Sequence, residues 1–98
     1  MGFEAVYFSP VNEMFVRCTA DTQKECLVKV VKEGLKVENG VDVESTDEEL
    51  LFSIRLAETH DENLEHLKYP TDPIGNAAVI VAWDRMTVPV GFIRRISV

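Results

Sequence analysis

The residues most able to do chemistry lie in one short segment, His60 to His66, which reads His-Asp-Glu-Asn-Leu-Glu-His. If this segment is a helix, Glu62 and His66 share a face at the i, i+4 spacing and could hold part of a metal site or act as an acid–base pair. His60 would lie about 240° from His66 around that helix, so the two imidazoles do not converge. The His-Glu-x-x-His motif is absent as well. The segment is therefore more typical of a solvated acidic surface, and we predict no metal ligand in it.

No nucleophile or cofactor motif accompanies these histidines. The two cysteines, Cys18 and Cys26, have no Cys-x-x-Cys spacing and no neighbouring histidine, so they are expected to be free, buried thiols in a reducing compartment. The five glycines are scattered and form no phosphate-binding loop. No hydroxyl residue stands in a nucleophile-elbow motif. We therefore predict no catalytic residue and no cofactor, and a non-enzymatic protein is favoured over an enzyme.

Two consecutive arginines interrupt the last apolar segment, residues 88–98. In a strand, Phe92 and Arg94 share one face while Ile93 and Arg95 share the other, so one guanidinium enters an apolar face whichever face is buried. A buried arginine needs a carboxylate or carbonyl partner. Arg94 could find this partner within the fold or across a subunit interface. The alternative is an exposed edge strand with both guanidinium groups in water.

The charge of the chain is concentrated in its middle third. The 98 residues include 17 acids and 10 bases, a net charge of −7. Residues 37–66 hold ten of those acids and only one base, Arg55, which leaves seven acids and nine bases elsewhere. This balance argues against nucleic acid as a partner and favours a protein with a basic surface or a second copy of the chain. The predicted partner-binding residues are Glu38, Asp42, Glu44, Asp47, Glu48, Glu49, Glu58, Asp61, Glu62, Glu65, Arg94 and Arg95.

These residues must be positioned by a helix and several strands. Thr22 and Glu25 have the spacing of a capping box, and apolar residues recur at helical spacing after them, so we predict a helix over 22–33 that ends at Gly34. Residues 35–38 and 41–44 alternate apolar and charged side chains around Asn39-Gly40. This pattern predicts a hairpin with a type I′ turn.

The segment from Ser45 to Ala57 is ambiguous. Thr46 and Glu49 could form a second capping box, which favours a helix. Alternating apolar residues from Leu50 to Ala57 would give a strand one clean apolar face, whereas a helix would spread them around its circumference. We favour the strand.

The rest of the chain predicts an antiparallel sheet. Strands are expected over 3–8 and 14–19, joined by a loop over 9–13, and again over 77–83 and 88–98. Pro89 places the start of the last strand at an edge or a bulge, and residues 61–68 are expected to form a short helix. The prediction is a single α+β domain over residues 1–98, a two-layer sandwich of a mainly antiparallel sheet with the 22–33 helix packed on one face.

Three functional hypotheses follow, in decreasing order. The first is a small acidic protein-binding module that forms a homodimer or binds a basic partner. The second is an acidic inhibitor, of the immunity-protein or DNA-mimic type, that covers a basic surface of its partner. The third is a small enzyme or metal site using His60 and His66. The longest apolar run is only seven residues, 77–83, too short to cross a membrane, and no signal peptide is visible, so a cytoplasmic protein is expected.

Overall fold

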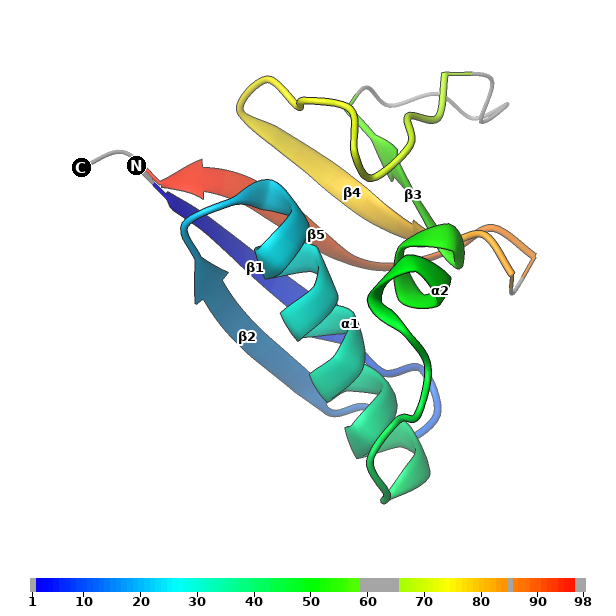
Figure 1. Cartoon of the computed structure of the whole chain (residues 1–98). Helices are drawn as coiled ribbons and strands as arrows, with labels where there is room; N and C mark the ends of the chain where they lie inside the picture. The colour runs from blue at the N-terminus through cyan, green and yellow to red at the C-terminus, as the bar shows by residue number, and fades with distance from the viewer. Residues whose placement is uncertain (1, 59–65, 85, 97–98) are drawn as a thin grey trace.

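The polypeptide forms a two-layer α+β structure in which one antiparallel sheet carries both helices on the same face (Figure 1). The computed structural model describes residues 2–58, 66–84 and 86–96. The strands pair in the order β2-β1-β5-β4-β3, all antiparallel, so the predicted fold class is confirmed. In chain order the elements are β1 Gly2–Phe8, β2 Phe15–Ala20, α1 Gln23–Asn39, α2 Asp47–Phe52, β3 Ile54–Ala57, β4 Ala77–Ala82 and β5 Val88–Ile96.

Helix α1 begins where the sequence predicts and ends six residues later than predicted. The Thr22 hydroxyl accepts a hydrogen bond from the backbone N–H of Glu25 at 3.2 Å, as an N-cap should. Gly34 does not end the helix. It lies on the buried face of α1, directly against the ring of Tyr7 from β1. The absence of a side chain at Gly34 therefore serves close packing and not termination.

The predicted hairpin over 35–44 is wrong because its first half continues α1. The Asn39-Gly40 pair does supply a positive φ, but as the end of the helix: Gly40 has φ 74°, and its N–H donates to the Lys36 carbonyl at 2.7 Å. The Asn39 side chain donates to the Leu35 carbonyl at 2.8 Å. Residues 41–44 then form an irregular connection to α2.

The ambiguous segment contains both of its alternatives, one after the other. The capping box forms, since Thr46 and Glu49 exchange side-chain to backbone hydrogen bonds at 3.2 Å. It starts α2, which buries Leu50 and Leu51. The chain turns at Ser53, and β3 follows, so the predicted strand is correct for residues 54–57 and wrong for 50–52.

The last two strands contain the predicted irregularity at Pro89. Ile80 pairs with Gly91 and Val81 with Pro89, which leaves Val90 as an extra residue in β5. Beyond this bulge, β5 pairs with β1 on one side and with β4 on the other, so it lies inside the sheet and is not an edge strand. In the expected helix over 61–68, residues 61–65 lie outside the described part, and Lys68 forms an isolated bridge with Leu56 of β3.

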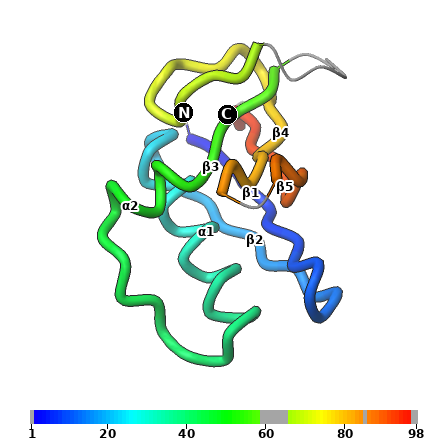
Figure 2. The backbone as a smooth tube through the Cα atoms, turned by 90° about the vertical axis from the view of Figure 1, so that its right-hand side faces the viewer, coloured from blue at the N-terminus to red at the C-terminus, as the bar shows by residue number. Residues whose placement is uncertain are grey.

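The core lies between the sheet and the helices. Ala5, Tyr7, Leu56, Ile80 and Ile93 project from the sheet and are buried. Helix α1 contributes four buried apolar side chains to the same core, Cys26, Leu27, Val30 and Val31. Both helices cover this one face, as the rotated view in Figure 2 also shows, and within the described residues no helix lies over the opposite face of the sheet.

Candidate functional site

The uncovered side of the sheet carries a continuous group of apolar side chains, which we call the open face: Val6, Phe8, Phe15, Val79 and Phe92. The strand register places them side by side, because Phe8 pairs with Phe15 and Val6 with Phe92, which in turn pairs with Val79. Phe15 is 68% exposed, and Phe8 and Phe92 are each 44% exposed. The apolar run over 77–83 is typical of a strand buried on both faces, and this holds only for the second half of β4: Val79 is 41% exposed, whereas Ile80, Val81 and Ala82 are buried.

One row of charges borders these apolar residues on the open face. Glu4 of β1 accepts from Arg94 of β5, with Nε at 3.0 Å and Nη2 at 2.9 Å, and lies 3.4 Å from Nε of Arg17 on β2. Arg94 therefore finds its carboxylate within the fold, which is one of the two partners expected for it. The three side chains leave the open face with one net positive charge, in contrast to the acidic chain as a whole.

Arg95 lies on the other side of β5 and has a structural role there. Its Nε and Nη2 atoms donate to the carbonyl of Ile74 at 3.1 and 2.8 Å, and Nε also donates to the carbonyl of Gly75 at 2.6 Å. Its guanidinium carbon is 5.3 Å from the centre of the Phe3 ring. The hydrogen bonds of Arg95 thus hold the segment before β4 against the sheet, and Arg95 is not part of the charge row that contains Arg94.

Several of the predicted acidic partner-binding residues form hydrogen bonds or ion pairs with other residues of the same chain. Glu38 accepts from the Tyr7 hydroxyl at 3.1 Å, Asp42 pairs with Lys36 at 3.3 Å, and Glu58 pairs with Lys68 at 3.3 Å. Glu49 is part of the capping box, while Glu44, Asp47 and Glu48 are exposed around the start of α2. Asp61, Glu62 and Glu65 lie outside the described residues. The exposed acids of this group thus lie on the helix side of the molecule.

The histidine segment lies almost entirely outside the described residues. His60 lies outside the described residues, and His66 is exposed. No group of three or more potential metal ligands occurs among residues 2–58, 66–84 and 86–96.

Both cysteines are free thiols, as predicted, but only Cys26 is buried in the core, and Cys18 is partly exposed beside it. Burial raises the pKa of Cys26, the more enclosed of the two, from 9.0 to about 11. Burial, with a smaller contribution from the Glu33 carboxylate, raises the pKa of Cys18. Neither thiol therefore has the lowered pKa of a reactive cysteine.

The raised pKa of Cys26 predicts a loss of stability at high pH. Between pH 9 and pH 11 the folded protein keeps the Cys26 proton while the unfolded chain releases it, so the free energy of unfolding falls as the pH rises through this range. Over this range the raised pKa of Cys26 accounts for a loss of about 2–3 kcal/mol in the free energy of unfolding. It is measured by urea unfolding at pH 8 and pH 11, as the extra pH-dependent loss in the wild type relative to Cys26→Ala. Equal losses in the two proteins would contradict the prediction.

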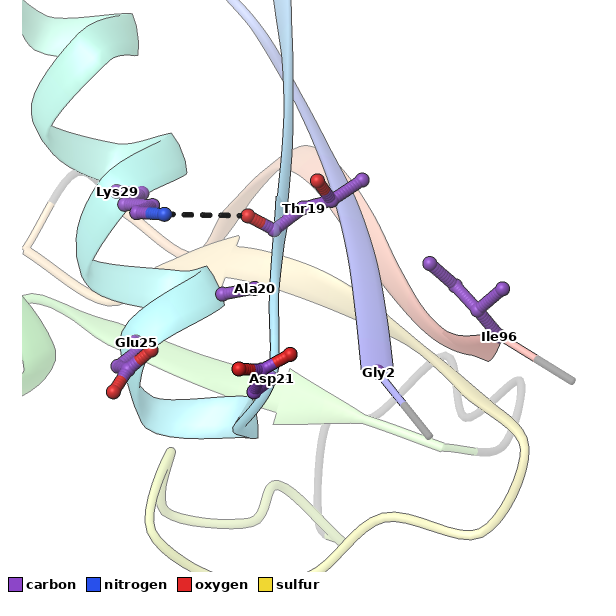
Figure 3. Close-up of a pocket in the computed structure, with 7 residues that line it drawn as sticks. All are labelled: Gly2, Thr19, Ala20, Asp21, Glu25, Lys29 and Ile96. Atoms are coloured by element: carbon purple, nitrogen blue, oxygen red, sulfur yellow. Dashed lines mark hydrogen bonds between the residues drawn. The ribbon is translucent and has the colours of Figure 1, made fainter. Parts of the chain in front are cut away.

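The hollow at the junction of β2 and α1 does not bring its charged side chains together at one point (Figure 3). The Lys29 ammonium donates to the Thr19 carbonyl at 3.4 Å and lies away from the carboxylates of Asp21 and Glu25. The Lys29 ammonium is thus bound to a backbone carbonyl and does not point to the two carboxylates that line the same hollow.

Arg55, the one base of the acidic window, forms a cluster that the sequence analysis did not find. It is only 8% exposed, although β3 is the edge strand. Its guanidinium carbon lies 4.6 Å from the centre of the Tyr69 ring, 5.1 Å from that of Trp83 and 5.4 Å from that of Phe52. In the sequence Arg55 stands out only as a base among acids. Phe52 is three residues away, but Tyr69 and Trp83 come from distant segments.

The comparisons with known proteins add no identification. No protein-family model matches the chain, and no curated protein and no solved structure matches it either. Within the described residues, no helix is both long and apolar enough to cross a membrane. The functional interpretation therefore rests on the surfaces described above.

Proposed function

We propose that this protein is a protein-binding module that forms a homodimer, in which two copies pack the open faces of their sheets against each other. The observation that carries the proposal is the contiguous row of exposed aromatic and aliphatic side chains on a sheet face that no helix covers. The largest contiguous apolar patch on a protein surface is often a site of interaction.

The composition of the open face, an apolar centre beside a row of charges, fits an interface with a second copy. With about 200 Å² for each phenylalanine side chain, the exposed parts of Phe8, Phe15 and Phe92 alone amount to about 300 Å² of apolar surface. Val6, Val79 and the Glu4–Arg94 row add to this area. A standard interface buries about 800 Å² on each partner, with an apolar centre and a polar rim, and the open face has both.

The charge distribution favours a second copy over an unrelated basic partner at this surface. The open face carries both signs, so in a two-fold arrangement an arginine of one copy can approach Glu4 of the other. The exposed acids Glu44, Asp47 and Glu48 lie on the helix side, where two copies packed sheet to sheet keep them far apart.

Sedimentation equilibrium over a range of protein concentrations tests the dimer. The wild type is expected to show a dimer mass that persists in 1 M salt, since burial of apolar surface and not charge drives the association. Phe92→Glu and Phe15→Glu each place two unpaired charges in the interface and should raise the dimer dissociation constant more than about hundredfold. Circular dichroism verifies that both variants are folded.

Val41→Glu is the matched control, because Val41 is 64% exposed but lies in the connection between α1 and α2. It should dimerise like the wild type. A wild-type monomer at all concentrations, or a Phe92→Glu variant that still dimerises, would overturn the proposal. A monomer that instead binds a basic protein and releases it as salt rises would favour the acidic-inhibitor hypothesis.

We also propose a cytoplasmic location, because the two free thiols fit a reducing compartment.

A further inference from the structure

A pocket of about 230 Å³ lies beside the Arg55 cluster, between the start of α1, helix α2 and the segment 69–71. The residues that line it include Lys24, Leu51, Phe52, Arg55, Tyr69 and Thr71. Phe52 and Tyr69 are largely exposed, so the pocket opens to solvent between aromatic rings. A charged side chain that is itself more than nine-tenths buried thus forms part of its wall.

Only half of the Arg55 guanidinium is used within the fold. Nη1 donates to the carbonyls of Phe52 at 2.8 Å and Ile54 at 2.7 Å, and so caps the end of α2 with a positive charge. Nε and Nη2 have no hydrogen bond to any described residue, and no carboxylate of the described part lies within 4.0 Å. Since no buried side-chain nitrogen or oxygen of the described residues is left unpaired, Nε and Nη2 must be reached by solvent.

The same edge of the guanidinium is occupied in two other arginines of this protein. Arg94 uses Nε and Nη2 to hold the Glu4 carboxylate, and Arg95 uses them to hold the Ile74 carbonyl. This edge presents two parallel N–H donors that match the two oxygens of a carboxylate. In Arg55 the corresponding donors bind no oxygen of the described residues, although the side chain is only 8% exposed and a largely buried charge is costly without a counter-charge.

We propose that this pocket binds a small organic carboxylate, with the carboxylate on the Nε/Nη2 edge of Arg55 and an apolar or aromatic group against Phe52, Tyr69 and Leu51. Lys24 and Arg55 outnumber the single acid of the lining, Glu48, so the pocket favours one negative charge. The volume is below that of drug-sized sites, which suits a ligand with a single ring or a short branched chain. The aromatic walls disfavour inorganic phosphate, which is strongly hydrated and has no apolar part.

Titration with phenylacetate tests the proposal, because Trp83 is the only tryptophan of the chain and lies beside the Arg55 guanidinium. We expect a saturable change in Trp83 fluorescence and a matching calorimetric signal, with a dissociation constant of about 0.1–5 mM. Phenylacetamide has the same shape without the charge and should bind at least about tenfold more weakly. The absence of saturation by about 20 mM phenylacetate, equal binding of the acid and the amide, or equally tight binding of inorganic phosphate would each overturn the proposal.

Two variants locate the binding at Arg55. Arg55→Lys keeps the charge but loses the two-pronged edge, and should weaken phenylacetate binding at least about tenfold. Thr71→Phe leaves Arg55 unchanged and fills the pocket from an exposed position, so it should abolish binding even if Arg55→Lys fails to fold. Val41→Phe adds the same ring at an exposed position outside the pocket lining; it is the control and should bind phenylacetate like the wild type. Unchanged binding in the folded Thr71→Phe variant would overturn the proposed location.

Discussion

Gly91→Ala is expected to lower the free energy of unfolding by about 3 kcal/mol or more, the largest effect of any single added methyl group in this protein. A Cβ atom at Gly91 would lie 1.8 Å from the carbonyl oxygen of Val6 and 2.9 Å from its carbonyl carbon. These atoms are backbone of the neighbouring strand β1, so no side-chain rotation can relieve the overlap. The pair β1–β5 would have to separate locally at the centre of the sheet.

Urea unfolding followed by circular dichroism measures this effect. Gly75→Ala is the matched control, because a Cβ at Gly75 meets nothing within 4 Å. It should change the free energy of unfolding by no more than about 0.5 kcal/mol. If the two alanine variants were equally stable, the close approach of β1 and β5 at Gly91 would be refuted.

Gly34→Ala has the second-largest expected effect, and two opposing contributions decide its sign. Alanine is about 1 kcal/mol more favourable than glycine inside a helix. However, a Cβ at Gly34 would lie 2.2 to 2.7 Å from three atoms of the Tyr7 ring. That ring is only 2% exposed and is held at its hydroxyl by Glu38, so it has no free space to move into. We expect a net destabilisation of about 2–3 kcal/mol.

A double-mutant cycle with Tyr7→Ala tests this explanation. Once the ring is removed, Gly34→Ala should become neutral or stabilising, because only the helix preference is left. All four proteins can be unfolded by urea in the same concentration of trimethylamine N-oxide, which keeps the weaker variants folded. The same destabilisation by Gly34→Ala with and without the ring would show that Tyr7 is not its cause.

The glycines also show why the sequence predicts some elements and not others. Gly34 and Gly40 both follow an amphipathic stretch, and either could end α1 from local pattern alone. The choice depends on Tyr7, which is 27 residues away from Gly34 and packs against it only in the folded sheet. By contrast, the caps at Thr22 and Thr46 involve residues three positions apart, so both are visible in the sequence, although the strand was favoured over the helix that Thr46 starts.

The same distinction holds for the candidate sites. The sequence shows that an acid-rich segment exists, but not that Asp42 and Glu58 form ion pairs with lysines of the same chain. Which face of the sheet stays open depends on the side against which both helices pack. The sequence does not show this side, because apolar residues such as Val79 and Ile80 occur on both sides of β4. Of the rings around Arg55, Tyr69 and Trp83 are brought there by tertiary structure, and no local sequence pattern predicts them.

The pairing of β1 with β5 has a consequence for how the chain is made. Gly2 pairs with Ile96 and β1 lies between β2 and β5, so β1 is synthesised well before β5, the strand that completes its hydrogen bonds. Until then, the β1–β2–α1 part and the β3–β4 part each keep an unpaired strand edge, of the kind that recruits other chains. Insertion of β5 closes both edges together. A nascent chain stalled before Val88 should therefore be the form of this protein that is most prone to aggregate.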